Sequence, residues 1–487
     1  MSWALFAAAA LAAPTTFEGH DYYVGDMHVH TGASGDAASA DLGKCPGSCG
    51  PLSDLGLLAL DRGMDFIAVT DHVNGPNVAS ADLYRYALDI GQDAHNRSDL
   101  VVIPGAEIWY RTPDAKKLGH KSLYLFGSDP QVEAFTLADA QFAGISDLVP
   151  DCDPIWDHVA QIEAVFGPTL LIAHHPSLVV PMETDWSCHN QSFAPVVEIY
   201  SEHGNSDRPE TDFDPPWSGY IAGTTVHDAL VEHEHRIGFI AGTDRHDTHP
   251  GDVCHLESML IGPAYGGGLT IAVLDEGEEL TRANLFDAFT ARRTYATSGP
   301  HAAATVDVLI NGEVAGGMGQ ELEVPKGSPV SIEARIDADH LPAMLGAVAV
   351  TPDERLEMTE ASGTWTIDLD PVPAWVYVEM QLDGDLIYES CTDGGADNEE
   401  RLWLSPTWFD LVPAKTETGD TGETGHTDTD TDTDTDTDTD TEADTDTDTD
   451  TAGDTAGKSK GCGCGSTAPA PWVWLLVAGT ALGRRRR

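Results

Sequence analysis

Seven short apolar runs between residues 22 and 244 constrain the fold of this chain more than any other feature. They are bounded by turn-forming residues, and helix-like segments lie between several of them. This alternation is typical of an α/β fold with parallel strands. The predicted strands are Tyr22–His30, Asp65–Asp71, Leu100–Ile108, His120–Phe126, Thr169–His174, Val196–Tyr200 and Ile237–Asp244.

Nearly every predicted strand carries a His, Asp or Glu at or just beyond its C-terminal end. In (β/α) barrels these ends meet at one face, which carries the active site. A helix is expected over Leu52–Arg62, where the apolar residues have helical spacing and Gly63 ends the pattern. We therefore predict a distorted (β/α)7 barrel over residues 20–300.

The pattern changes after residue 300, where predicted strands follow one another without helical segments. These strands are Val306–Leu309, Val330–Ala334, Ala347–Val350, Thr364–Leu369 and Trp375–Gln381. They predict a small all-β, sandwich-like domain over residues 301–412. Residues 413–457 are dominated by an alternating Thr-Asp repeat that has little apolar surface to bury, so a disordered stalk is expected there.

Both ends of the chain resemble export signals. Residues 1–12 contain an apolar run that ends in Ala10-Leu11-Ala12, a cleavage pattern of signal peptides, although the usual basic n-region is missing. Residues 458–487 combine a cysteine motif, a short apolar segment and four arginines, as bacterial sorting tails do, and a plain C-terminal anchor is the alternative. We expect an exported protein, at the cell surface or secreted after C-terminal processing, with its tail in the membrane or cell envelope before processing.

The cysteines indicate the compartment of the protein, and the net charge limits its partners. Eight cysteines in an exported chain indicate oxidising conditions. Cys45 and Cys49 flank a Pro-Gly turn and are placed to close a small loop, whereas the pairing of Cys152, Cys188, Cys254 and Cys391 stays open. A formal charge of −56 repels nucleic acid, so a small-molecule substrate is the expected partner. The oligomeric state is not readable from the sequence.

The first predicted strand contains the motif that suggests chemistry. Asp26, His28 and His30 alternate along it and therefore point to the same face. Ten residues of metal-ligating type lie in or near the seven strands: His28, His30, His72, Glu107, His120, His174, His175, Glu198, Asp244 and His246. Buried ionisable groups are costly unless they are paired or bind metal, so their joint convergence predicts a metal site.

These motifs together resemble the PHP (polymerase and histidinol phosphatase) superfamily of metallohydrolases. The residues that carry the resemblance are His28-x-His30, Thr70-Asp71-His72, Glu107, His120, His174-His175-Pro176 and Asp244-x-His246. Three longer stretches are similar to a poorly characterised exported branch: Glu198-Ile-Tyr-Ser-Glu-His-Gly, Gly242-Thr-Asp-Arg-His and Arg293-Thr-Tyr-Ala-Thr-Ser-Gly. The resemblance covers roughly residues 22–300 and identifies no substrate.

The resemblance implies a site for two or three divalent ions. One ion would be held by His28, His30, Glu107 and Asp244, with Glu107 bridging to a second held by His120 and a histidine of the fifth strand. The His-Pro pair favours His175 for that ligand, and the end of the apolar run favours His174. His72 and His246 would hold the third ion, where Asp36 replaces a histidine of some relatives.

The expected chemistry follows from such ions. Mixed nitrogen and oxygen ligands suit Zn, Mn or Fe. Two ions about 3.5–4 Å apart activate water and clamp the attacking and leaving oxygens, so no nucleophilic serine is needed. The sequence contains no Gly-x-Ser-x-Gly elbow. Asp26, Asp71 and His203 are the candidate orienting or proton-carrying residues.

Phosphoesters are the first substrate class that we predict. Arginine clamps phosphate well, and Arg245 lies between two predicted ligands. Further basic residues near two other ligands are Arg111, Lys116, Lys117 and Lys121. The alternative is that these cations only offset neighbouring acids.

Three other functions stay open. A hydrolase of carbamates, amides or carboxylic esters with the same fold is the first, and a non-catalytic surface binding protein is the second. Amidohydrolases, the third, share the His-x-His start but need a modified lysine at a strand end, which the predicted strands lack.

Overall fold

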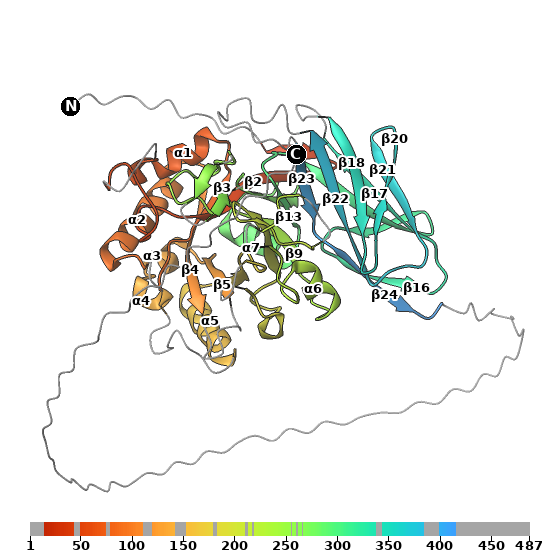
Figure 1. Ribbon diagram of the computed structural model, residues 1–487, viewed down its shortest axis with the longest axis horizontal. Coiled ribbons are helices and arrows are strands. Elements are labelled where there is room, and N and C mark those ends of the chain that lie inside the picture. Colours follow the sequence, from red (N-terminus) through yellow and green to blue (C-terminus); the bar gives the residue numbers. More distant parts are fainter. Residues whose placement is uncertain are drawn as a thin grey trace, which may run out of the picture. The chain divides into compact units, whose positions relative to one another are not determined.

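The computed structural model places 14 of the described strands in one sheet. Figure 1 shows how the strands and helices are arranged. The structure describes residues 14–42, 49–74, 78–110, 119–141, 152–178, 183–209, 213–216, 219–254, 256–259, 262–264, 266–337, 343–383 and 399–414. The predicted signal peptide, Thr-Asp repeat and sorting tail lie outside these residues, as do Cys45 and Cys391. None of the described helices has the length and apolar character needed to cross a bilayer.

The predicted (β/α)7 barrel is wrong, because the strands lie in open sheets. The 14-stranded sheet has the order β16-β24-β22-β23-β13-β12-β2-β3-β4-β5-β6, with β1, β18 and β19 attached to it. Its strands in the first part of the chain are β1 (Thr15–Phe17), β2 (His20–Val29), β3 (Phe66–Val69), β4 (Val101–Tyr110), β5 (Gly119–Leu125) and β6 (Thr169–Ala173). A separate sheet pairs β8 (Gly204–Asn205), β7 (Val196–Ser201) and β9 (Gly238–Ala241), and a two-stranded one joins β10 (Leu256–Met259) and β11 (Gly262–Ala264).

Two features of the chain depart from the all-parallel pairing of a (β/α) barrel. Only eight residues, 111–118, separate β4 from β5, and parallel pairing needs a crossover of a dozen or more. The two strands therefore pair antiparallel, as do β5 and β6. On the other side of β2, the strand β12 (Leu269–Asp275) pairs antiparallel with residues 20–25, and the end of β2 is hydrogen-bonded to the segment after β9. Strand β12 is not among the strands predicted from the sequence.

Seven α-helices occur among the described residues: α1 (Leu55–Asp61), α2 (Ala81–Arg97), α3 (Asp129–Glu133), α4 (Leu137–Ala140), α5 (Asp153–Phe166), α6 (Val226–Val231) and α7 (Arg282–Thr290). Two 3-10 turns, η1 (Leu52–Asp54) and η2 (Trp186–Cys188), accompany them. Figure 1 shows that the helices lie around the strands of the first half of the chain, coloured red to green.

Apolar side chains alternate along the central strands and supply a core on each face of the sheet. In β3, Ile67 and Val69 face the core shared with α1, α2 and α5. Phe66 and Ala68 face the opposite core, which contains residues of α7. This burial on both faces explains why the predicted strands are continuous apolar runs.

Only strands form the regular structure of the described part of residues 301–412. A five-stranded sheet has the order β15 (Glu313–Gly317), β14 (Ala304–Ile310), β17 (Val330–Ile336), β21 (Thr364–Leu369) and β20 (Thr359–Ala361). The remaining strands extend the large sheet: β16 (Glu321–Pro325), β18 (Met344–Val350), β19 (Arg355–Glu357), β22 (Trp375–Asp383), β23 (Glu399–Leu404) and β24 (Thr407–Val412). They join β2 through β12 and β13 (Thr294–Thr297), so hydrogen bonds run without a break between the two halves.

A buried ion-pair network ties three strands of this second half together. Glu379 of β22 accepts hydrogen bonds from Arg355 of β19 at 2.8 and 3.0 Å and from Arg401 of β23 at 2.7 Å. Its burial alone would raise the pKa of Glu379, but the hydrogen bonds from Arg355 and the charge of Arg401 lower it. The carboxylate therefore stays charged and paired.

We expect Glu379→Ala to lower the free energy of unfolding by about 3–5 kcal/mol, because it leaves two guanidinium groups without their buried partner. Urea denaturation followed by circular dichroism measures this change. Glu357→Ala, at an exposed position of β19, is the control and should change stability by less than about 0.5 kcal/mol. Equal stability of the two variants would contradict the role of the network.

Candidate metal centre

Strand direction explains how residues far apart in the sequence meet. Strands β2, β3 and β4 are parallel, so their C-terminal ends lie at the same edge of the sheet. Strand β5 runs antiparallel to β4 and therefore begins at that edge, where His120 lies. Strand β6 runs antiparallel to β5 and ends there, directly before His174. The early position of His120 in its strand is thus a result of reversed strand direction.

The short sheet of β7, β8 and β9 supplies further donors. Asp244 follows β9, and its backbone N–H donates to the carbonyl oxygen of His28 at 2.8 Å. Asp244 and His175 have φ values of +56° and +31°. Residues other than glycine seldom adopt such values, and these conformations cluster at functional sites.

His28 and His30 form the centre of the donor cluster. Their Nε2 atoms lie 3.1 Å apart. Both lie 3.0–3.4 Å from Oε2 of Glu107 and 3.1–3.4 Å from Oδ1 of Asp244. The four side chains are buried, and their donor atoms lie within 4.8 Å of one another. Four donors at this spacing are able to surround one cation.

Glu107 connects this group to its neighbours. Its Oε2 atom lies 3.3 Å from Nδ1 of His72, and its Oε1 atom lies 2.7 Å from Nδ1 of His120. Glu107 and His120 also belong to a second group of donors, which includes His174 and His175. A carboxylate that bridges two ions would stand in this position.

Glu198 binds the Nδ1 atoms of two imidazoles of the cluster. It accepts hydrogen bonds from Nδ1 of His28 at 2.9 Å and from Nδ1 of His174 at 2.5 Å. The Nε2 atoms of both rings consequently face Asp244, at 3.4 and 3.3 Å. This is the arrangement by which carboxylates orient metal-binding histidines. Glu198 is also able to bind an ion itself, together with these two histidines.

Both histidines of the His174-His175 pair lie in the cluster. His174 contacts Glu198 and Asp244, whereas the Nδ1 atom of His175 has no hydrogen-bond partner. Burial and the neighbouring imidazole of His174 hold the pKa of His175 well below its ordinary value. A neutral ring with a free nitrogen is available as a ligand.

A third group of donors consists of His30, His72 and His246. Asp36 lies beside it, with its Oδ2 atom 3.3 Å from His72 and 3.7 Å from His246. His203, predicted as a proton carrier, lies 2.8 Å from Oδ2 of Asp244 and forms a metal-capable group with that residue and His174. The ten predicted ligands therefore all lie in the cluster or directly beside it.

The two aspartates predicted as catalytic bind the backbone around the cluster. Asp26 accepts hydrogen bonds from the N–H groups of His28, Thr243 and Gly251 at 2.8–3.1 Å. Its burial raises its pKa to about 6, although these bonds oppose the shift. Asp71 accepts hydrogen bonds from the backbone and hydroxyl groups of Thr31 and Ser34. Both carboxylates therefore hold the segments that carry donors in place.

The guanidinium group of Arg245 has its partners outside the donor cluster. It pairs with Asp247 at 2.6 Å and with Asp252 at 3.4 Å, and it donates to the carbonyl oxygen of Cys254. Lys121 follows His120 in β5, where neighbouring side chains point to opposite faces, and its ammonium group lies 5.9 Å from the ring centre of Trp156. The other three predicted cations lie outside the described residues.

Glu202 lies beside the site and was not predicted from the sequence. Its side chain is fully buried, neither carboxylate oxygen has a hydrogen-bond partner, and Oε1 lies 3.7 Å from Nδ1 of His246. Its position directly after β7, next to His203, was the available signal.

The cluster fits divalent metal ions by its donor chemistry. Burial alone would raise the pKa of Glu107, but the imidazoles of His72 and His120 hold it well below its ordinary value. Burial alone would lower the pKa of His28, but the charges of Asp244 and Glu198 raise it well above its ordinary value. The buried carboxylates are therefore stable here only when positive charge lies beside them. Metal ions supply this charge better than protons, because the Nε2 atoms of His28 and His30 face each other and cannot both carry a proton.

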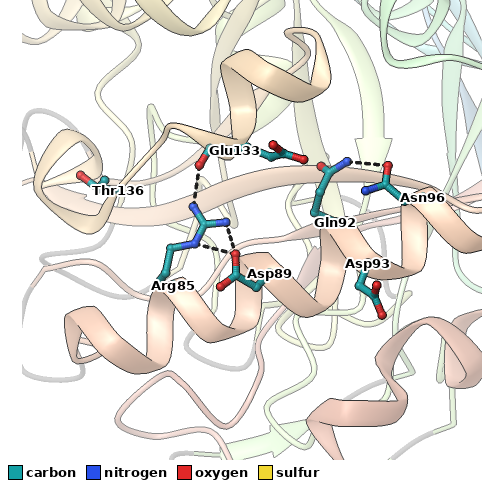
Figure 2. A pocket seen from close by; sticks show the side chains of 7 residues that line it. All are labelled: Arg85, Asp89, Gln92, Asp93, Asn96, Glu133 and Thr136. Carbon is teal, nitrogen blue, oxygen red and sulfur yellow. Dashed lines mark hydrogen bonds and ion pairs between the residues drawn. The ribbon is translucent and has the colours of Figure 1, made fainter.

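A surface depression of about 490 Å³ lies elsewhere, at α2 (Figure 2). Arg85 there pairs with Asp89 and donates to the carbonyl oxygen of Glu133 at 2.9 Å. Asp93 also lines it, and no donor of the cluster does. The chemistry of the cluster therefore does not extend to this depression.

Comparisons with known proteins do not establish a family. No protein-family model and no curated protein matches the chain. The chain is similar to the solved structure of a two-domain protein from Bacteroides vulgatus that contains a predicted PHP-like metal-dependent phosphoesterase. The identity is 13%, the TM-score is 0.37, and the match covers 77% of this chain and 95% of that one. Similarity at this level carries no argument, so the function rests on the geometry.

We expect Gly242→Ala to lower the metal content of the purified protein. A Cβ atom at Gly242 would lie 2.4 Å from Cβ and 2.7 Å from the backbone nitrogen of His28, so the strand that carries His28 must shift. Elemental analysis measures the metal per chain. Gly346→Ala is the control, since its Cβ atom would meet only Oε1 of Gln381 at 3.4 Å. The same metal content in both variants would refute this close approach.

Proposed function

We propose that this chain is a metal-dependent hydrolase that uses two or three divalent ions to activate water, and that its substrates are phosphoesters. The observation that carries the proposal is the convergence of the His28 and His30 Nε2 atoms on the oxygens of Glu107 and Asp244 at 3.0–3.4 Å. The resemblance of these motifs to PHP metallohydrolases is in accord with it.

Distinct roles follow for the residues of the cluster. His28, His30, Glu107 and Asp244 would hold one ion, and Glu107 with His120, His174 and His175 a second. Such ions lower the pKa of water and stabilise negative charge on the attacked group. Glu198 keeps two of the imidazoles in orientation, which preserves the spacing of the donors.

His203 is the proposed proton carrier. Its Nε2 atom lies 2.8 Å from Oδ2 of Asp244. The side chain of His203 is 11% exposed, whereas that of Asp244 is 1% exposed. An imidazole that touches both the buried donors and the solvent is suited to move protons between them.

A second candidate substrate class has an observation in its favour. The guanidinium group of Arg245 is held by Asp247 and Asp252 and is therefore not free to clamp a phosphate. Carboxylic esters, amides and carbamates carry no charge that needs such a clamp. A hydrolase of these uncharged groups is the alternative, with the same ions and ligands.

We also propose that the protein works outside the cytoplasm. The disulfide between Cys152 and Cys188 supports this, and Cys49 and Cys254 are disulfide-bonded as well. Structural disulfides persist mainly in oxidising compartments. The proposed attachment to the cell envelope rests on the terminal sequences alone.

Removal of the metal should abolish hydrolysis. We expect chelator-treated protein to lose its activity on an aryl phosphodiester, and Zn²⁺, Mn²⁺ or Fe²⁺ to restore it. His28→Ala should stay inactive after metal is added back. An aryl carboxylic ester assayed in parallel distinguishes the two substrate classes. Full activity after complete metal removal would reject both of them.

Glu198→Gln tests the orienting carboxylate. We expect its metal affinity to fall by about 10–100-fold, because glutamine cannot accept both imidazole N–H groups as a charged partner. Metal titration monitored by activity gives the affinity. Thr15→Ala, at an exposed position of β1, is the control for handling and folding.

A further inference from the structure

A second group of histidines lies apart from the metal centre. His189 directly follows η2, and His233 and His235 lie in the turn between α6 and β9. Among the described residues, the ring contacts of these three histidines are with Trp186 and with one another. None of them has a role in the proposed hydrolysis.

Two of the three ring pairs have a spacing that suits a shared metal ion. The donor atoms of the three described histidines do not all lie within 4.8 Å of one another, so His233 must rotate to bring its ring to the ion. The ring centres of His189 and His235 lie 4.3 Å apart, and those of His233 and His235 lie 5.5 Å apart. Imidazoles that bind one ion at about 2.1 Å have ring centres roughly 4.5–5.5 Å apart. In the main cluster, the ring centre of His28 lies 4.0 Å from that of His174 and 5.1 Å from that of His30. The His189–His235 and His233–His235 pairs therefore have ring spacings similar to those of the main cluster.

The hydrogen bond of His235 leaves one ring nitrogen for an ion. Its Nε2 atom donates to the backbone carbonyl oxygen of Trp186 at 2.8 Å. The proton therefore resides on Nε2, and Nδ1 keeps its lone pair. A backbone carbonyl that fixes the tautomer in this way commonly supports a metal-binding histidine.

His189 offers a neutral ring with an unused nitrogen. Its Nε2 atom is buried and has no hydrogen-bond partner. Burial, with a smaller contribution from His235, lowers the pKa of His189 to about 3, so protons do not compete for this ring near neutral pH. A buried polar atom without a partner is costly, and a bound ion would remove that cost.

His233 is placed to complete the group. It is partly exposed, and its side chain has no hydrogen bond among the described residues. A rotation of its side chain is therefore inexpensive. The carboxylates of Glu232 and Glu234 flank it at exposed positions and oppose the repulsion that the ammonium group of Lys121 exerts on a cation here.

We propose that His189, His233 and His235 bind one divalent transition-metal ion of the class that prefers imidazole, such as Zn²⁺. The ion would link the segment after η2 to the turn before β9. This site is independent of the proposed hydrolytic centre, since it shares no ligand with it.

Zinc stoichiometry of the full chain tests the proposal. Metal-free protein is loaded with Zn²⁺, passed over a desalting column and analysed for zinc per chain. We expect His233→Ala and His189→Gln each to bind one zinc fewer than the unmodified protein, while activity on the phosphodiester stays unchanged. His158→Ala, a partly buried histidine of α5 that lies outside the group, should bind as much zinc as the unmodified protein.

His233→Ala is the decisive variant, because its side chain supports no packing or hydrogen bond whose loss would unfold the protein. The same assay in an Asp244→Asn background removes one proposed ligand of the main centre, and His233→Ala should still lower the zinc content by one there. An unchanged zinc content in His233→Ala, or an equal loss in His158→Ala, would overturn the proposal.

Discussion

The structure of the first half of this chain depends on the concentration of negative charge at one edge of its large sheet. Glu107, Glu198 and Asp244 are buried there, within hydrogen-bonding distance of five imidazoles from four segments of the chain. Carboxylates in such a place are tolerated only when positive charge is supplied. The histidines around them are therefore required by the same electrostatics that would hold metal ions.

Hydrogen bonds that do not involve the donors keep this arrangement in place. Asp26 joins β2 to the segment after β9, and Asp71 joins the end of β3 to the segment after β2. Each carboxylate accepts several backbone N–H groups and so fixes two segments at once. The close approach of Gly242 to His28 sets the distance between the two sheets. The donors thus lie on segments whose backbone is fixed by other hydrogen bonds, as a preorganised site requires.

The sequence predicted the positions of the strands well and their arrangement in sheets poorly. Predicted strands such as Thr169–His174 and Val196–Tyr200 agree closely with β6 (Thr169–Ala173) and β7 (Val196–Ser201). An apolar run indicates that both faces of a strand are buried. This is true of central strands whether they pair parallel or antiparallel. Strand direction and the insertion of β12 next to β2 depend on loop length and long-range pairing, which periodicity does not report. This is why the barrel was predicted and an open sheet is found.

The sequence by itself determined which residue types are available for chemistry, because alternating His and acidic residues at strand ends are readable one segment at a time. Only the tertiary structure decided how each is used. It directed Arg245 towards Asp247, placed Glu198 behind two imidazoles, and buried Glu202 beside His246. The physical reason is that a side chain's role is set by its neighbours in space, and these come from strands whose pairing no local pattern encodes.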